Sequence, residues 1–231
     1  MARNFDGTND NLLSANDAIA GLDVDQKSWS FWILKPVGNA DALIHGITAN
    51  AGTAITQISS AVPVTSGVRY DLAQTHSVTT GRWRTDDQTL SVRHHIAITY
   101  DRSSTLNVPV MYVDGVSVTA NVVNAPVGTP TTGDDTLKMG EDAAGTGDLE
   151  GALQNVAIAA GVLWDAAVVN RAMRWGRPHG GLLVYHPFWG PKLADEGSAA
   201  ETLTATGTTV TAIATPVVRP GVMTMGCGVG W

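Results

Sequence analysis

The chain has 231 residues, enough for one large all-β domain or two small domains. Hydrophobic residues make up 44% of it, which excludes a disordered chain. The net charge is −7 and no cluster of lysines or arginines stands out, so direct binding of nucleic acid, which needs concentrated positive charge, is not predicted. Charged residues make up only 15%. This low value fits either a surface partly covered by a partner or a Thr- and Ser-rich β surface.

The first residues do not resemble a secretory signal. Residues 1–7, M-A-R-N-F-D-G, lead directly into a strand-like segment, without a basic start and an apolar run of about 7–15 residues. No segment approaches the roughly 18 apolar residues of a membrane span. We therefore expect no membrane partner and no secretion by a signal peptide. Cys227 is the only cysteine, so neither an intrachain disulfide nor a cysteine-based metal site can form.

Strand signals dominate the chain up to about residue 160. The strongest is Ser28–Lys35, S-W-S-F-W-I-L-K, with Trp29, Phe31 and Ile33 on one face. Trp32 and Leu34 make the other face apolar as well, which predicts a central strand with both faces covered. Further strands are expected at residues 42–48, 54–59, 137–140 and 150–159, with short Thr-rich strands between residues 63 and 90.

A hairpin is predicted between residues 93 and 120. The segment His95–Tyr100 alternates between two faces, and Val110–Val113 does the same after a short loop. Asp114-Gly115 supplies the two positive-φ positions of a tight type I′ turn, after which residues 116–120 return as the next strand.

One helix is expected near the end of this region. Asp165 is a suitable N-cap, and the segment A-A-V-V-N-R-A-M-R-W runs from there to Gly176 and Pro178, which stop it. We expect Val168, Ala172 and Trp175 to form its packed face.

Many short strands and a single late helix predict an all-β fold, a jelly-roll sandwich of two antiparallel sheets. We assign residues 1–178 to this domain and residues 179–231 to a C-terminal extension. The extension comprises an added strand at Leu182–Trp189 and an apolar, Gly-rich end. That end fits an extended arm that orders against a neighbouring subunit, and the alternative is a tail lying on its own domain.

Six motifs occur in an order that identifies a family resemblance. They are F-D-G-T-N-D-N-L at residues 5–12, W-S-F-W-I at 29–33, H-H-I-A-I-T-Y-D at 94–101, V-M-Y-V-D-G at 110–115, L-K-M-G at 137–140 and D-L-E-G-A-L-Q-N-V-A-I at 148–158. Together they resemble the LamG-like jelly-roll domains of the concanavalin A-like lectin and glucanase superfamily, over residues 2–176. The continuation L-V-Y-H-P-F-W-G resembles the tail that follows such domains in bacteriophage virion proteins. Gln154 and Asn155 stand where relatives often carry an acidic residue, so no ion or ligand is predicted at those positions.

No catalytic residue and no cofactor is predicted. Retaining glucanases of the superfamily need two carboxylates about 5 Å apart, which two glutamates on one strand face can provide. The glutamates of this chain are never at spacing i, i+2 or i, i+4. His94 and His95 are adjacent and point to opposite faces, so they cannot chelate zinc together. Several acidic residues between 134 and 148 offer oxygen ligands for Ca²⁺, which the superfamily often binds, but their spacing matches no known cage. The glutamates are Glu141, Glu150, Glu196 and Glu201, and the other histidines are His45, His76, His179 and His186.

Four residues are predicted to contribute to binding. Trp83 lies between Arg82 and Arg84 in a polar stretch, which suggests an exposed aromatic side chain suited to a sugar ring or a protein partner. Trp231, the last residue, could fill a pocket on a neighbouring subunit.

These observations lead to two functional hypotheses. The first is a non-enzymatic virion structural protein, a capsid decoration protein of a tailed bacteriophage that assembles in the host cytoplasm. Its partners would be the major capsid protein or other virion proteins, together with its own copies as a homo-oligomer. The alternative is a carbohydrate-binding module of a phage tail or cell-surface adhesin, with a glycan as partner. An enzyme is not expected, and the scaffold by itself does not decide between these hypotheses.

Overall fold

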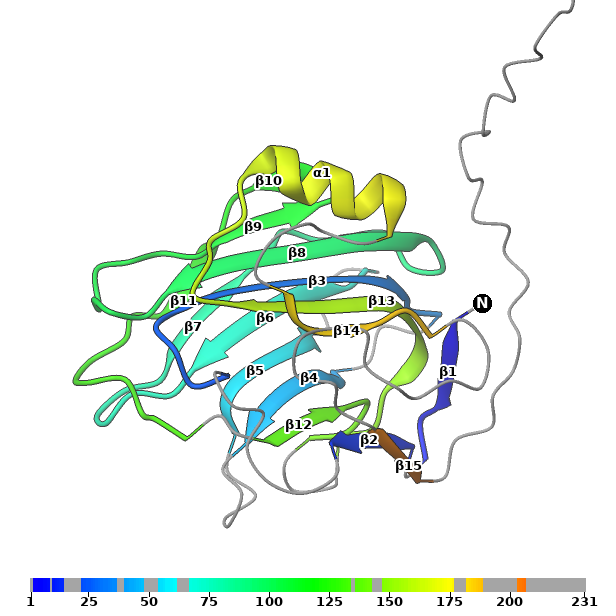
Figure 1. Ribbon diagram of the computed structural model, residues 1–231, viewed down its shortest axis with the longest axis horizontal. Coiled ribbons are helices and arrows are strands. Elements are labelled where there is room, and N and C mark those ends of the chain that lie inside the picture. The colour runs from blue at the N-terminus through cyan, green and yellow to red at the C-terminus, as the bar shows by residue number, and fades with distance from the viewer. Residues whose placement is uncertain are drawn as a thin grey trace, which may run out of the picture.

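The protein is a sandwich of two antiparallel sheets with one helix on its outside (Figure 1). The computed structural model describes residues 2–8, 10–14, 22–36, 40–47, 54–61, 67–133, 136–142, 147–176, 182–188 and 203–206. Within these residues, sheet A has the order β1-β13-β3-β8-β9-β10, and β14 also pairs with β13. Sheet B has the order β11-β7-β6-β5-β4-β12-β2-β15. The predicted jelly-roll sandwich is therefore confirmed.

Most strand bounds follow the predicted segments, whereas β2, β11 and β15 were not predicted. Sheet A contains β1 (Arg3–Asp6), β3 (Gln26–Leu34), β8 (Arg93–Asp101), β9 (Val110–Val113), β10 (Val116–Val118), β13 (Glu150–Ala160) and β14 (Leu182–His186). Sheet B contains β2 (Asn11–Ser14), β4 (Ala42–Ile47), β5 (Ala54–Ala61), β6 (Arg69–Gln74), β7 (Gly81–Arg84), β11 (Asn121–Asn124), β12 (Thr136–Met139) and β15 (Leu203–Thr206).

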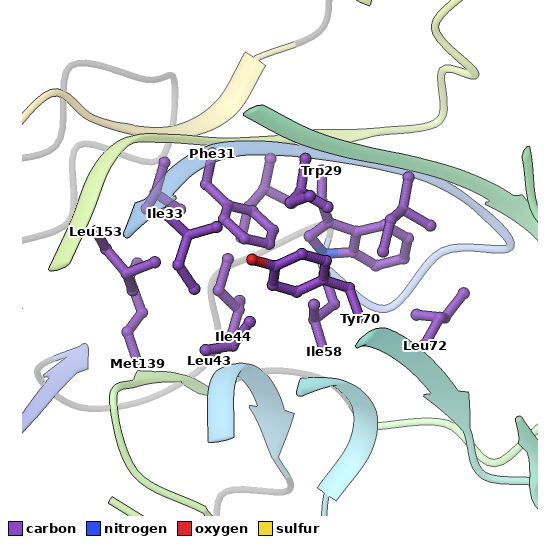
Figure 2. Packing of buried hydrophobic residues seen from close by; sticks show 14 of the residues in the cluster. Trp29, Phe31, Ile33, Leu43, Ile44, Ile58, Tyr70, Leu72, Met139 and Leu153 are labelled. Atoms are coloured by element: carbon purple, nitrogen blue, oxygen red, sulfur yellow. The ribbon is translucent and has the colours of Figure 1, made fainter. Parts of the chain in front are cut away.

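The core lies between the two sheets, and strand β3 is at its centre. β3 pairs with β8 on one side and β13 on the other, as its two apolar faces predicted. Figure 2 shows Trp29, Phe31 and Ile33 pointing from β3 toward the opposite sheet. Sheet B contributes large apolar side chains of its own to this core. Those labelled in Figure 2 are Leu43, Ile44, Ile58, Tyr70, Leu72 and Met139.

The predicted hairpin forms β8, β9 and β10. Asp114 and Gly115 both have positive φ, 51° and 79°, as a type I′ turn requires. The Asp114 carboxylate also organises the neighbouring strand, because its Oδ1 accepts a hydrogen bond from the backbone N–H of His95 at 2.8 Å. Its Oδ2 lies 2.8 Å from Nδ1 of His94. The hairpin is thus framework, tied together by its own turn residue.

Helix α1 (Ala166–Trp175) lies over the outer face of sheet A (Figure 1). Its ends are as predicted: the Asp165 side chain accepts a hydrogen bond from the N–H of Val168, and Gly176 ends the helix in the left-handed conformation. The predicted packed face is only partly right. Ala172 is buried, but the other buried residue is Val169, and Trp175 is 63% exposed. Val168 is half-buried and packs against the apolar cluster beneath the helix.

Segments beyond residue 178 extend both sheets. β14 lies within the strand predicted at residues 182–189 and pairs with β13. β15 pairs with β2 at the far end of sheet B. The remainder of the predicted arm, including Trp231, falls outside the described residues.

Candidate functional site

The predicted exposure of Trp83 is wrong. Trp83 is 1% exposed and packs in the core, where its ring lies 4.9 Å from that of Tyr100. The reason is the alternation of β7: Arg82 and Arg84 point to the outer face of sheet B, so the residue between them must point inward. Trp83 therefore cannot act as a platform for a sugar.

Arg82 and Arg84 converge on one aspartate of the neighbouring strand. Asp71 on β6 is fully buried and accepts hydrogen bonds from Nε of Arg82 at 2.6 Å and from Nε of Arg84 at 2.6 Å. The hydrogen bond to Asp71 raises the pKa of the Arg84 guanidinium, although burial opposes the change. Two cations on one anion leave a modest positive charge on this face. Both arginines are thus paired with an anion of the protein.

The two histidines of β8 separate as predicted. His94 faces the interior, where its Nε2 donates to the carbonyl oxygen of Thr89 at 3.1 Å. His95 faces the outer side, with Nε2 2.9 Å from Oγ of Ser30. Burial lowers the pKa of His95 to about 4, and the nearby Arg93 lowers it further against the opposing effect of Asp114. His95 is neutral at physiological pH.

The described residues contain no group of three or more His, Cys, Asp or Glu side chains that could hold a metal ion. Within the acidic region, Glu141 is bound by neighbours instead, since its Oε2 accepts a hydrogen bond from Asn11 at 2.6 Å and pairs with Lys138 at 2.8 Å. None of the helices in the described part of the chain is long and apolar enough to cross a membrane.

A cavity of about 280 Å³ lies on the outer face of sheet A, where β3, β8 and β13 run side by side. Its position follows from register: Trp32 of β3 lies opposite Gln154 of β13, and Leu34 lies opposite Arg93 of β8. We call it the Trp32 cavity. It is lined by Ala2, Trp32, Leu34, Ser91, Arg93, Ala152 and Gln154.

Three lining side chains, Trp32, Arg93 and Gln154, determine the chemistry of the Trp32 cavity, and His95 packs beside them. The guanidinium of Arg93 lies 4.6 Å from the centre of the Trp32 ring, in a cation–π contact, and one of its N–H groups donates to Oε1 of Gln154. The rings of His95 and Trp32 form an edge-type contact, with 5.2 Å between the ring centres. Burial lowers the pKa of Arg93. The cavity therefore combines an aromatic wall with a partly desolvated cation and an amide.

One feature of the sequence could have indicated this cavity. Trp32 lies on the second apolar face of β3, which was expected to be covered by packing, yet the side chain is only half-buried. Gln154 and Arg93 carried no signal as ligand-binding residues, because only strand pairing brings them beside Trp32.

A second surface lies where β10 and β11 end their sheets. Only Thr119 and Ala120 separate the two strands, so the edges that β10 and β11 form among the described strands lie on the same side of the sandwich. Residues 116–133 contain no charged side chain. We call this surface the uncharged edge. Its exposed apolar residues are Val116 (66% exposed), Val122 (56%), Val123 (42%) and Val127 (49%).

Comparisons with known proteins agree with this architecture. The model of the concanavalin A-like lectin/glucanases superfamily matches residues 6–169. No curated protein sequence matches the chain. Among solved structures, a heptameric SAP-like pentraxin from Limulus polyphemus is similar, with a TM-score of 0.66, 13% identity, and coverage of 90% of this chain and 93% of that one.

Two further structures are similar over smaller parts of longer proteins. A putative carbohydrate binding protein from Bacteroides ovatus has a TM-score of 0.64 and 14% identity, with coverage of 94% of this chain and 61% of that one. Tailspike protein 2 of the Escherichia coli O157:H7 bacteriophage CAB120 has a TM-score of 0.52 and 13% identity, with coverage of 74% and 25%. At these identities the likeness concerns the fold alone. By the match of the family model, the chain belongs to the concanavalin A-like lectin and glucanase superfamily.

Proposed function

We propose that this chain is a non-enzymatic structural protein of a bacteriophage virion, which decorates the capsid by binding capsid subunits and its own copies. The observation that carries the proposal is the uncharged edge. Natural sheets protect exposed edge strands with charges, above all lysine, because unpaired backbone groups there bind other strands. Here the edge strands of both sheets lack such charges and expose valines.

Burial of the uncharged edge against protein would be favourable. The exposed side chains of Val116, Val122 and Val123 lose contact with water on association, at about 25 cal/mol per Å² of apolar surface buried. Many copies on a particle would each add stability to the shell by mass action, without any chemical turnover. The occurrence of this fold in a phage tailspike protein supports a virion setting.

The proposal is tested first by self-association. Val122→Lys with Val123→Lys places two charges on the uncharged edge, and Leu13→Lys is the matched control. Leu13 lies on β2, which is separated from β11 by five strands of sheet B, and it is 37% exposed. Analytical ultracentrifugation should show oligomers for the wild type and for the control, and a monomer for the double variant.

The proposed location of the protein on the capsid is tested by antibody labelling of phage particles in electron micrographs. Label on the capsid is the expected result. A chain that stays monomeric at all concentrations and labels no particle would refute the proposal.

Carbohydrate binding is a second candidate, favoured by the Trp32 cavity. A half-buried indole beside polar donors is an arrangement that suits a sugar ring, whose C–H groups pack on the aromatic side chain while its hydroxyls bind the donors. A glycan array with wild type and Trp32→Ala decides this question, with Trp175→Ala as a control at an exposed tryptophan elsewhere. Binding that is lost only in Trp32→Ala supports a lectin, and no binding to any glycan excludes it.

A further inference from the structure

We propose that the Trp32 cavity binds a sugar that carries a carboxylate, with Arg93 and Gln154 holding the carboxylate and Trp32 the ring. This inference rests on the second candidate function, carbohydrate binding, and specifies its ligand class. Three independent features of the cavity support it.

The first feature is an uncompensated cation. Arg93 donates to the amide oxygen of Gln154 and stacks on Trp32, and no carboxylate among the described residues pairs with it. Its pKa is lowered by burial, with no anion opposing the change. Four other arginines, by contrast, have an anionic partner. Each of Arg69, Arg82, Arg84 and Arg102 pairs with an aspartate.

The second feature is an unused hydrogen-bond donor beside that cation. Gln154 is 2% exposed, and its Oε1 faces Arg93, which orients the amide so that Nε2 must find a different partner. No acceptor in the described part of the chain binds Nε2. A buried amide without an acceptor is unfavourable by about 1–3 kcal/mol. A ligand oxygen that accepts this hydrogen bond removes the penalty.

A carboxylate can balance the charge of Arg93 and accept the hydrogen bond of Gln154 at the same time. It is an acceptor only, with two oxygens, so one can bind Nε2 of Gln154 while the other binds the guanidinium of Arg93. A neutral hydroxyl could accept the amide hydrogen bond but would leave the charge of Arg93 unbalanced. The chemistry therefore selects an anion over a neutral sugar.

The third feature is the size of the Trp32 cavity and its apolar lining. The cavity of about 280 Å³ lies just below the range for small-molecule sites, which fits a single ring. Trp32, Leu34 and Ala152 form its apolar part. A bare inorganic anion would leave this apolar surface uncovered, whereas the C–H face of a sugar covers it.

The test compares charged and neutral sugars of the same shape. Titration of the full chain with D-glucuronate, D-galacturonate, D-glucose and D-galactose is followed by nuclear magnetic resonance and calorimetry. We expect a uronate to bind at least ten times more tightly than its neutral counterpart, with an affinity that falls as salt is added.

Two variants and a control locate the effect. Gln154→Glu keeps the shape of the side chain but gives Arg93 an internal carboxylate, so the uronate should bind at least ten-fold more weakly. Arg93→Gln should weaken uronate binding similarly, and by a larger factor than it weakens binding of the neutral sugar. Arg171→Gln removes an exposed charge on helix α1 and should change neither. Circular dichroism verifies that each variant is folded.

The outcomes distinguish a failure of the carboxylate preference from a failure of carbohydrate binding as a whole. Binding of charged and neutral sugars with equal affinity, unaffected by Arg93→Gln, would overturn the carboxylate inference and leave carbohydrate binding in place. Uronate binding that survives both cavity variants would also overturn it. If the glycan array and the titrations both show no sugar binding, the inference fails together with the second candidate function.

Discussion

Arg84 holds the carboxylate of Asp71 at two points, with Nε 2.6 Å from Oδ1 and Nη2 2.8 Å from Oδ2. Such a two-point contact fixes the geometry of both partners and is stronger than a single hydrogen bond. Because Asp71 is fully buried, this ion pair, unlike an exposed one, matters for the stability of sheet B.

Asp71→Asn should therefore destabilise the protein measurably. The amide cannot accept all the hydrogen bonds that the two arginines donate, and it leaves their charges facing each other. We expect the free energy of unfolding to fall by about 1–3 kcal/mol. Asp87→Asn, which breaks the more exposed pair with Arg69, should cost less than about 1 kcal/mol. Urea denaturation of both variants measures the difference, and equal losses would contradict the assignment.

Trp83→Ala should be among the most damaging single substitutions. The indole fills space between the sheets, so its removal leaves a large cavity and should cost about 3–5 kcal/mol. Trp175→Ala removes an equally large but exposed side chain and should change stability by less than about 0.5 kcal/mol. Thermal unfolding of the two variants, followed by circular dichroism, distinguishes them. A small effect at Trp83 would mean that the side chain does not lie in the core.

The free energy of unfolding should fall as the pH is lowered, over a pH range set by the pKa of His95. The pKa of this histidine is about 4 in the folded protein and about 6.5 when unfolded, so between these values only the unfolded chain binds the proton. Stability from the neutral ring is therefore complete above pH 6.5 and is lost as the pH falls toward 4, by on the order of 3 kcal/mol. The free energy of unfolding of His95→Gln should change less over this window than that of the wild type. Parallel curves for the two proteins would refute the role of His95.

Two glycines with similar backbone angles should respond differently to alanine. Gly115 has φ of 79°, and an added Cβ would lie 2.6 Å from Oδ1 of Asn170 on helix α1. Gly161 has φ of 71° and open space around the same position. Gly161→Ala should cost about 1 kcal/mol from backbone strain alone, and Gly115→Ala about 2–3 kcal/mol because the Asn170 side chain, which donates to the Gly115 carbonyl oxygen, must also move. Chemical denaturation measures both, and equal costs would show that the Asn170 side chain does not restrict the turn.

The framework could be predicted because it is encoded locally. The alternation of residues 28–35 identified a central strand, and Asp114-Gly115 identified the hairpin turn, since each depends on neighbours in the chain. The same rule explains the error at Trp83. Polar neighbours suggested exposure, yet in a strand they point away from the residue between them, so R-W-R is the pattern of a buried aromatic side chain.

The Trp32 cavity could not be predicted in this way. It forms because β3, β8 and β13 are adjacent, and no spacing in the sequence places Gln154 and Arg93 beside Trp32. The contact of Asp71 with Arg82 and Arg84 has the same origin, since it joins two strands across a turn. Sites made by strand pairing become visible only when the register is known.

Strand β13 has a consequence for how the chain reaches its native state. One edge of β13 is shared by β1, which pairs with its first residues, and by β14, which pairs with its last (Figure 1). The other edge completes the central strand β3. During synthesis, β1 and β3 emerge from the ribosome early, but they can pair with β13 only after residues from Glu150 onward have been made. Contacts so distant in sequence form slowly, because a long loop must close before they contribute. The sandwich therefore folds late, and a chain that stops before Glu150 would leave β3, the strand of Trp29, Phe31 and Ile33, at an unpaired edge of sheet A.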